Sequence, residues 1–484
     1  MSLPTATLPP LSKVAVIGAG SLGLAQVKQL IDRGVQKKDI VVYEARDDVG
    51  GIWRFEEDAE DPSVYYTQAG QPLYLTSAGL NNPHSIPPSP MYKSLRTNLP
   101  NYVMAFRDNP FDKGTDIFPA HHRIQDYLRR FGEVHGLAQK CSVHRLFHTP
   151  SPASDAERWT IQSETDGQPF EEKFSHVVIA NGHYNQPFIP YIPGLWNFKG
   201  KIAHSQSWRS AAEYQGKKLL IVGAKSSGSD IAHDLSLANL ALPDSSNKSK
   251  IYLSTRTIPA EVFPEPLEQW TKQVQIVPSL RSVSSSGVIT FSDGMTLGPE
   301  ELDVVLFATG YNFAYSFIDQ TKDEPWKSHS VVSPRLAVSR EGDAERPPPE
   351  KVQPGLEGRV GGSAVHHLDG SCEMFYLPDP TIAFIGLAYW VVPFRLSEVQ
   401  SRVIAYAWTQ ARQIPAELPP IQKSEELEGN PHAIGMPAEW LNTNGWLKAI
   451  GEGGQDGPGW HEATEEWIQQ RTTAKAFRKE LYGY

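Results

Sequence analysis

The chain has 484 residues, of which 40% are hydrophobic, 21% charged and 10% aromatic. This composition excludes disordered, collagen-like and coiled-coil proteins, and it is typical of a soluble globular protein of about three domains. The formal net charge of -10 argues against nucleic acid or an anionic membrane surface as a partner. Two cysteines are too few for a disulfide framework, a zinc site or an iron–sulfur cluster, and no metal site is predicted.

The pattern of apolar residues predicts a cytoplasmic protein that does not cross a membrane. The first residues lack the basic and then apolar pattern of a secretory signal. The longest apolar stretch covers residues 381–394, about 14 residues, whereas a helix needs about 20 to cross a bilayer. Residues 344–362 are rich in Pro and Gly and are expected to form a surface loop.

The chain opens with two apolar runs that flank a glycine-rich turn and a helical segment. Residues 13–17 are apolar, residues 18–23 read GAGSLG, and residues 24–33 have a helical pattern. A second apolar run at 40–43 ends in Glu44. This order of strand, turn, helix and acid-ended strand is the fingerprint of a dinucleotide-binding unit.

Each residue of this first fingerprint has a physical task. Gly18 permits the tight turn, Gly20 lets the backbone approach a pyrophosphate, and Gly23 allows the helix to pack closely on the strand. The N-terminus of the helix at 24–33 offers free N–H groups to phosphate, and Ser21 of the turn is a predicted cofactor contact. Glu44 is placed to accept the hydroxyl hydrogens of an adenosine ribose, which favours FAD as the ligand of this unit.

A second unit of the same kind follows in the middle of the chain. It consists of an apolar strand at 218–222, the turn GAKSSG at 223–228, a helix at 230–239 and a strand at 251–254. The middle glycine is replaced by Lys225, whose side chain crowds a pyrophosphate lying on the turn but whose ammonium group can contact a phosphate.

The residues after the second strand of this unit select the dinucleotide. The sequence Ser-Thr-Arg-Thr at 254–257 has no carboxylate for a free 2′-hydroxyl, and its hydroxyls and guanidinium suit a 2′-phosphate. NADPH is therefore favoured over NADH, and an ordinary surface arginine is the alternative. The predicted NADPH contacts are Gly223, Lys225, Ser226, Ser227, Arg256 and Thr257.

Five further segments accompany the two fingerprints. They are GGIW at 50–53, YKSLRTNLP at 92–100, FKGKIAHSQSW at 198–208, ATGY at 308–311 and EVQ at 398–400. With them, the chain resembles the class B flavin-dependent monooxygenases, and more closely the flavin-containing monooxygenases, along most of its length. The pattern FxGxxxHxxx between two nucleotide fingerprints is the specific part of this resemblance.

The resemblance implies an α/β fold with two Rossmann-like dinucleotide-binding domains. The NADPH-binding domain, residues 193–303, is expected to be inserted into the FAD-binding domain, residues 1–192 and 304–484. By the same resemblance, NADPH reduces the flavin, the reduced flavin adds O2 at C4a, and the hydroperoxide oxygenates an amine nitrogen or a thioether sulfur of a small molecule. The protein places the cofactors and excludes water.

The resemblance also assigns residues around the flavin. Asn98 matches the active-site asparagine of the family, and its amide can orient the reacting oxygen by hydrogen bonds without titrating. Thr97, Gly51 and Trp53 are expected to contact FAD. Thr309 lies where small residues let the backbone come close to a cofactor.

Two further site residues are predicted, each with an alternative. His204 is expected to be a hinge histidine that links the position of NADPH to the flavin, and a proton-transferring base is the alternative. Ser397 and Glu398 predict a capping box that starts a helix. If this helix points at the flavin, its positive end stabilises the anionic reduced ring and Gln400 contacts it; the alternative is a capped surface helix.

Three other functions stay open at this stage. Trp208 ends the signature as is usual in Baeyer–Villiger monooxygenases, so ketone oxidation is the alternative reaction, although Arg209 follows where that group prefers Pro or Asp. Lys225 supports a non-catalytic flavoprotein, and an uncoupled NADPH oxidase is the third possibility. The oligomeric state is left open, with a homodimer as one option.

The substrate is expected to be a small molecule that reacts together with O2. Aromatic residues downstream of the ATGY segment are candidates for its pocket. They are Phe313, Tyr315, Phe317 and those of the loop 389–394. The alternative is that these side chains belong to the hydrophobic core.

Overall fold

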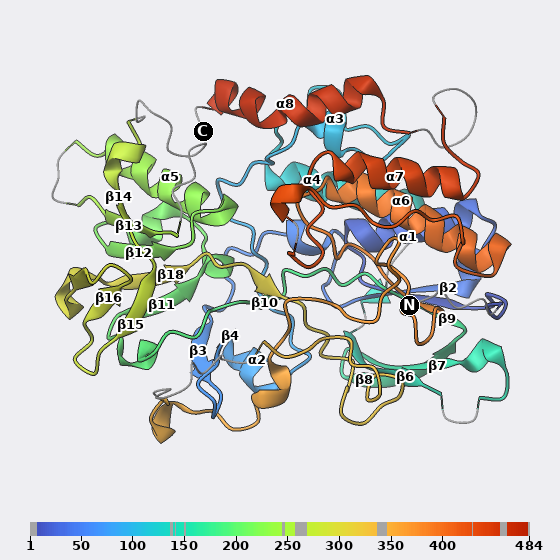
Figure 1. The fold of residues 1–484 in the computed structure, drawn as a ribbon, viewed down its shortest axis with the longest axis horizontal. Helices are drawn as coiled ribbons and strands as arrows, with labels where there is room; N and C mark the ends of the chain where they lie inside the picture. The colour runs from blue at the N-terminus through green and yellow to red at the C-terminus, as the bar shows by residue number, and fades with distance from the viewer. Residues whose placement is uncertain are drawn as a thin grey trace.

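A computed structural model describes residues 7–135, 139–140, 142–149, 152–243, 247–256, 269–335, 346–427, 429–454 and 462–482. Two α/β units lie side by side along the long axis of the molecule (Figure 1). Each unit is built around a five-stranded sheet. The N-terminal and C-terminal parts of the chain form the first unit, and the middle of the chain forms the second (Figure 1).

The sheet of the first unit is parallel throughout, in the order β20-β9-β1-β2-β5. Its strands are β1 (Val14–Ile17), β2 (Ile40–Glu44), β5 (Gln139–Lys140), β9 (His176–Ile179) and β20 (Ile382–Phe384). Every residue of β1, β9 and β20 is buried. Apolar, fully buried strands are what a parallel sheet covered on both faces requires.

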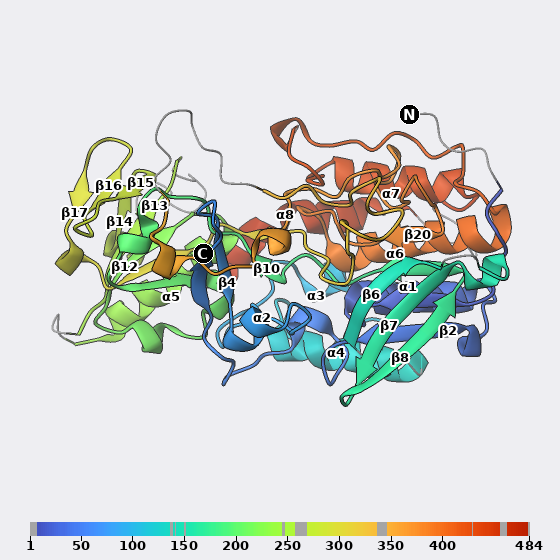
Figure 2. The same cartoon turned by 90° about the horizontal axis from the view of Figure 1, so that it is seen from below.

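Different layers cover the two faces of the first sheet (Figures 1 and 2). One face carries the helices α1 (Ser21–Asp32), α4 (His121–His135), α6 (Pro393–Tyr406) and α7 (Ala438–Ala449), and the other carries the antiparallel strands β6 (Ser142–His148), β7 (Trp159–Thr165) and β8 (Gln168–Phe174). Because side chains alternate along a strand, Val14 and Val16 join the core beneath the helices. Ala15 and Ile17 join the core beneath the antiparallel strands.

The second unit repeats this plan with the strand order β11-β18-β12-β13-β14, again parallel throughout. Its strands are β11 (Lys201–His204), β12 (Lys218–Val222), β13 (Lys250–Ser254), β14 (Val274–Val277) and β18 (Val304–Phe307). Leu219 and Ile221 pack beneath helix α5 (Ser226–Ala241). Leu220 points to the other face, which is covered by the antiparallel strands β15 (Leu280–Val283), β16 (Ile289–Phe291) and β17 (Thr296–Leu297).

The second sheet is inserted into the first, as expected, because all of its strands lie in sequence between β9 and β20. The two segments that connect the units pair with each other: β10 (Gln186–Pro187) is antiparallel to β19 (Tyr311–Asn312). The predicted limits of 193–303 leave out β18, which lies between β11 and β12, so the second sheet continues to residue 307.

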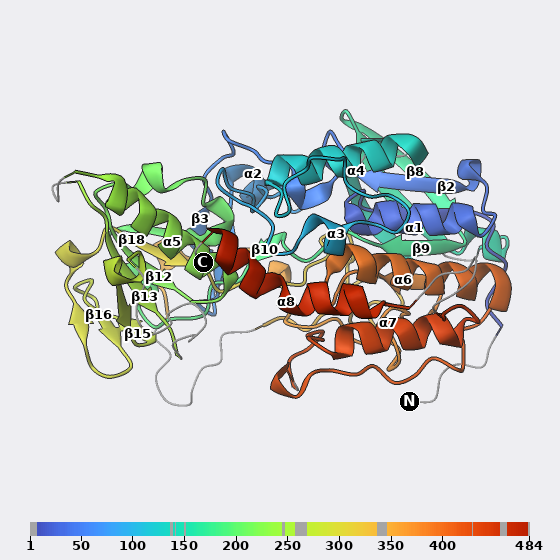
Figure 3. The ribbon, with the colours of Figure 1, turned by 90° about the horizontal axis from the view of Figure 1, so that it is seen from above.

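The remaining elements lie between the units or on top of them. They are β3 (Ser63–Tyr66), β4 (Pro72–Leu75), α2 (Ser77–Asn81), α3 (Asn101–Met104) and α8 (Glu465–Tyr482). Helix α8 runs from above α3 toward α5 of the second unit (Figure 3). Of the predicted loop 344–362, the described residues 346–362 contain short 3₁₀ turns but no strand or α-helix. Leu356 and Val360 anchor this segment by packing on Leu73.

Most predicted boundaries of the two fingerprints agree with the structure within a few residues, but one helix start is wrong. Helix α6 begins at Pro393, with no side-chain cap, four residues before the predicted capping box. Ser397 instead donates its hydroxyl to the Phe394 carbonyl, 2.7 Å away, and Glu398 is buried inside the helix. Proline at the first helical position needs no N–H partner there, and this favours the earlier start. Among the described residues, no helix is long and apolar enough to cross a membrane.

The connection into the second unit depends on one glycine. Gly194 has a φ of +72°, and a Cβ at this position would lie 1.8 Å from the Val283 carbonyl oxygen of β15. The substitution Gly194→Ala should therefore lower Tm by at least about 4 °C more than Gly167→Ala, which shares the strained φ but faces open space. Thermal unfolding followed by circular dichroism measures both, and equal effects would contradict the close contact.

Candidate active site between the two units

The glycine-rich turns of the two units have almost the same geometry. Gly18 has a φ of +108°, and a Cβ there would lie 2.6 Å from the carbonyl oxygen of Ala180, which follows β9. Gly223 has a φ of +107°, and its Cβ would lie 2.6 Å from the carbonyl oxygen of Ala308, which follows β18. Only glycine fits such a position. Each turn is therefore pressed against the segment that carries the chain from one unit to the other.

The later positions of the two turns also correspond. A Cβ on Gly23 would lie 1.8 Å from the Gly18 carbonyl oxygen, and a Cβ on Gly228 would lie 1.8 Å from the Gly223 carbonyl oxygen. These contacts are the close helix–strand packing that the fingerprint requires. Helices α1 and α5 consequently present their N-terminal N–H groups at the carboxyl ends of the sheets, where phosphate binds.

Lys225 leaves the shape of the second turn unchanged. Its φ and ψ are -82° and -171°, and those of Gly20 at the matching position are -73° and -173°. Any residue adopts this extended backbone. Lys225 is exposed, and its ammonium nitrogen lies 5.1 Å from the ring centroid of Trp390. The replacement therefore adds a cation beside the turn without distorting the cradle for a dinucleotide.

Glu44 lies at the carboxyl end of β2, where an adenosine ribose is expected. Its buried carboxylate accepts the backbone N–H of Ala19 and that of Arg46, both at 2.8 Å. Burial raises the pKa of Glu44, and these N–H groups act in the opposite direction. Each carboxylate oxygen has a second lone pair, so Glu44 can still accept ribose hydroxyls in the pose that the fingerprint predicts.

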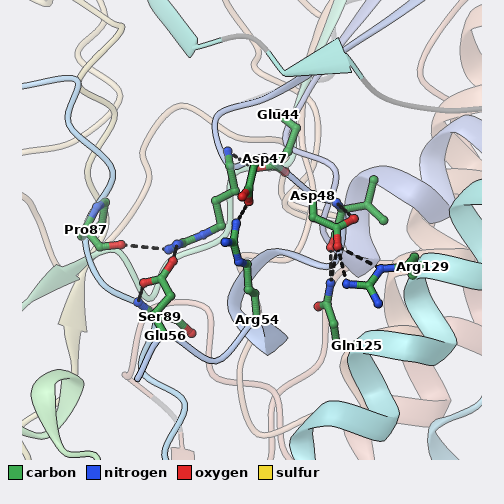
Figure 4. Close-up of polar contacts among 11 residues, drawn as sticks. Glu44, Asp47, Asp48, Arg54, Glu56, Pro87, Ser89, Gln125 and Arg129 are labelled. Atoms are coloured by element: carbon green, nitrogen blue, oxygen red, sulfur yellow. Dashed lines mark hydrogen bonds and ion pairs between the residues drawn. The ribbon is translucent and has the colours of Figure 1, made fainter. Parts of the chain in front are cut away.

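The loop after Glu44 is held by a network of polar contacts (Figure 4). Arg46 donates to the Pro87 carbonyl at 2.8 Å and forms an ion pair with Glu56. Arg129 of α4 donates to Asp48 at 2.9 Å, and Gln125 donates to the Val49 carbonyl at 2.6 Å. Charged and amide groups on both sides thus fix the backbone of residues 46–56.

This loop brings two predicted FAD contacts to the first turn. The Gly50 N–H donates to the Ala19 carbonyl at 2.9 Å. A Cβ on Gly20 would lie 3.5 Å from the Cα of Gly51, so the two backbones are close and leave one side of the turn open. Trp53 is half-buried and meets Phe394 edge-to-face, with 6.5 Å between ring centroids.

Asn98 lies on a segment that spans the two units. At one end of this segment, the Tyr92 hydroxyl donates to Asp230 of α5 at 2.7 Å. Toward the other end, Thr97 is buried, its N–H donates to Pro119 at 3.0 Å and its hydroxyl donates to Leu99 at 2.8 Å. Asn98 itself is exposed, and within the described structure its amide has no hydrogen-bond partner. An amide so placed is free to bind a ligand between the units.

His204 ends β11 and is completely buried. Its Nδ1 accepts the Gln206 N–H at 3.1 Å, so its Nε2 carries the proton and donates to the Gly310 carbonyl at 3.0 Å. Burial lowers the pKa of His204 to about 3. The ring is therefore neutral, with both nitrogens occupied by backbone, which favours the hinge role over proton transfer.

The other predicted contacts lie in both units and in the segment that connects them. The Thr309 hydroxyl donates to the Phe188 carbonyl, and the buried Gln400 accepts the Gly386 N–H at 3.2 Å. Exposed side chains at the start of α5 and the end of β13 surround the second turn; they are Ser226, Ser227 and Arg256. Thr257 lies outside the described residues.

The comparisons with known proteins agree with this geometry. The model of the family described as "Flavin-binding monooxygenase-like" matches residues 11–68 and 88–259. The matched residues include both nucleotide fingerprints, and over them the chain is similar to this family. It is a flavin-dependent monooxygenase whose cofactors are FAD and NADPH, and the two turns and Glu44 fit these dinucleotides.

Several relatives and solved structures are similar along most of the chain. The Arabidopsis thaliana flavin-containing monooxygenase FMO GS-OX-like 9 is 26% identical over 434 residues, which cover 88% of this chain and 82% of the relative. The S-allyl-L-cysteine S-oxygenase of Allium sativum has a TM-score of 0.68 at 24% identity, covering 98% of this chain and 94% of that structure. A flavin-containing monooxygenase from Stenotrophomonas maltophilia has a TM-score of 0.53 at 18% identity, covering 82% and 97%.

One residue that positions the two units of this monooxygenase was missed in the sequence. Arg209 is buried, and its guanidinium donates to the carbonyls of Glu56 at 2.9 Å and Gln206 at 2.8 Å. It thereby ties the signature of the second unit to the loop that reaches the first turn. The only sign of this role in the sequence is that Arg209 directly follows the signature. An exposed surface arginine would fit the same position equally well.

Several aromatic residues considered for the site belong to the core instead. Trp208 is fully buried beneath α5 and stacks on Tyr214, with 5.0 Å between ring centroids. Tyr315 and Phe317 are buried beneath the first sheet. Phe313 is also buried but lies at the edge, 5.4 Å from the ring of His183. Packing therefore accounts for Trp208 without reference to the reaction.

The neutral state of His204 predicts a pH effect on stability. Its folded-state pKa of about 3 lies below the ordinary histidine pKa of 6.5, so the unfolded chain binds more protons between these values. The stabilisation is complete above about pH 6.5 and is lost as the pH falls. From about pH 7.5 to pH 5.5, the wild type should lose about 1.4 kcal/mol more than the non-titrating His204→Gln variant.

Chemical unfolding at the two pH values measures this difference. The exposed His122→Gln substitution on α4 is the control for the loss of a surface imidazole. The same pH dependence in the wild type and the His204 variant would show that His204 is not held neutral.

Proposed function

We propose that this monooxygenase oxygenates the sulfur of a small thioether. The observation that carries the proposal is that the junction offers a neutral amide, Asn98. The histidines there are already hydrogen-bonded to backbone groups. His204 is held by two backbone groups, and the His183 Nδ1 bonds to the Gly386 carbonyl at 2.9 Å. Burial lowers the pKa of His183 to about 4. A soft nucleophile that attacks an electrophilic oxygen donor needs no base, and these histidines offer none.

The names of similar proteins support sulfur as the target. The Allium sativum structure, at a TM-score of 0.68, is an S-allyl-L-cysteine S-oxygenase. Bound FAD and NADPH supply hydride transfer and the activation of O2. The chain itself would bind both dinucleotides at its two turns, orient the reacting groups through Asn98, and exclude water at the junction of the two units.

The alternative functions have less support. Trp208, the one signature residue that favours ketone oxidation, is accounted for by its packing on Tyr214. Lys225, which favours a non-catalytic flavoprotein, leaves the backbone of the second turn in the same conformation as the first. Nitrogen oxygenation uses the same chemistry as sulfur oxygenation and is distinguished by assay.

The proposal is tested by supplying a thioether, a tertiary amine and a cyclic ketone in separate reactions with NADPH and O2. The thioether should yield a sulfoxide in proportion to the NADPH consumed, as measured by liquid chromatography and absorbance. A lactone or an N-oxide as the sole product would replace sulfur oxygenation by that reaction. NADPH consumption that no substrate changes would indicate an oxidase.

Asn98 should control how well NADPH consumption is coupled to product. The Asn98→Ala substitution removes an exposed amide, so the fold and cofactor content should not change. We expect the ratio of sulfoxide to NADPH to fall about tenfold, with the difference appearing as hydrogen peroxide. The exposed Asn81→Ala on α2 is the matched control. Unchanged coupling in the Asn98 variant would remove Asn98 from the proposed site.

A further inference from the structure

Among the residues that the structure describes, Arg335 has no carboxylate partner, and it lies near the junction of the two units. Many other described arginines form ion pairs, for example Arg145 with Asp323 and Arg158 with Asp379, whereas Arg281 and Arg359 do not. No ion pair or side-chain hydrogen bond involves Arg335 within the described residues. In a protein of net charge -10, an arginine left without an acid suggests that its anion comes from a ligand.

The contacts of Arg335 place it beside the hinge. Its guanidinium carbon lies 3.7 Å from the ring centroid of Phe188. The Phe188 N–H donates to the Gly310 carbonyl at 2.8 Å, and the Thr309 hydroxyl donates to the Phe188 carbonyl. The same Gly310 carbonyl accepts His204. Arg335 is therefore one side chain away from the segment that follows β18.

Tyr389 provides a second, independent position for Arg335. The two side chains interact electrostatically. Tyr389 follows β20, and its ring lies 6.2 Å from that of His183, which follows β9. The acid on this side, Glu373, is already bound by Lys423 at 3.3 Å and by His432 at 2.6 Å. Arg335 thus lies near the segments that follow β9, β18 and β20, and no carboxylate of the described residues neutralises it.

The geometry suits recognition of an oxyanion. Stacking on Phe188 holds the plane of the guanidinium, and the N–H edge stays free for a bidentate contact. Arg335 is exposed, so a ligand can reach its guanidinium from solvent. A guanidinium held against an aromatic face can bind a planar carboxylate through its N–H edge.

We propose that Arg335 binds an acidic group of the substrate, so that the thioether oxygenated by this enzyme carries a carboxylate or a similar oxyanion. This inference rests on the proposed function only for the thioether; the acidic group is inferred from Arg335. The other possible source of the anion is the 2′-phosphate of NADPH. The predicted partner of the 2′-phosphate is Arg256, which follows β13 of the second sheet. Arg335 lies elsewhere, against Phe188 and near Tyr389, which follows β20.

Binding to the oxidised holoenzyme tests the proposal without turnover. The probes are 3-(methylthio)propanoate and its neutral amide, titrated in the presence of NADP+ and followed by the flavin absorbance. The wild type should bind the acid roughly ten- to hundredfold more tightly than the amide. Arg335→Ala should abolish this preference and leave amide binding within about twofold. Arg335→Lys should restore part of it, because a lysine keeps the charge but not the bidentate edge.

Two controls separate the alternatives. Arg281→Ala on β15, an exposed arginine of the second unit, should behave as the wild type. The Kd of NADP+ should not change in Arg335→Ala, and a Kd that rises while the acid preference persists would assign Arg335 to the dinucleotide. A wild type without acid preference, or a variant that keeps it, would overturn the proposal.

Product analysis separates this inference from the proposed function. If the acid binds through Arg335 but NADPH turnover yields no sulfoxide, the assignment of sulfur oxygenation fails and the anion site stands. If sulfoxide forms equally from the acid and the amide in the wild type and in Arg335→Ala, the anion site fails and sulfur oxygenation stands.

Discussion

The structure depends on how the two segments that connect the units are held together. The chain leaves the first sheet after β9 and returns to it after β18, and each of these exits is pressed against a glycine turn, Gly18 in one unit and Gly223 in the other. β10 and β19 pair with each other, and His204 donates to Gly310 beside them. A cofactor bound on either turn therefore touches the same structure that sets the position of the other unit.

This arrangement explains why His204 is neutral. A protonated imidazole would have two N–H donors, but the Gln206 N–H already points at its Nδ1. Burial and this donor hold the ring in one tautomer, and the ring acts as a rigid link between β11 and the returning chain. Arg209 adds a second link, from the signature to the loop over the first turn. Both are polar contacts to backbone, so they set distance and orientation.

An acidic protein can hold two anionic dinucleotides because the binding groups are local. Backbone N–H groups at the starts of α1 and α5 carry the partial positive charge that phosphate needs. Few side-chain cations are required, and those at the junction, Lys225 and Arg335, lie on the aromatic faces of Trp390 and Phe188. Aromatic faces leave a cation accessible to a ligand, whereas a carboxylate would neutralise it.

The sequence by itself determined the two nucleotide units, the insertion of one into the other and the resemblance to flavin-containing monooxygenases. Local rules are sufficient for these features, because a positive φ and a close helix–strand contact allow only glycine at Gly18, Gly23 and their counterparts. The start of α6 was predicted wrongly, since Ser397 and Glu398 satisfy a capping pattern that also fits the interior of a helix whose first residue is Pro393. Only the tertiary structure decided that Trp208 belongs to the core, that Lys225 leaves its turn undistorted, and that no carboxylate of the described residues pairs with Arg335. Each of these depends on which residues of distant segments lie next to one side chain, and no local pattern records that.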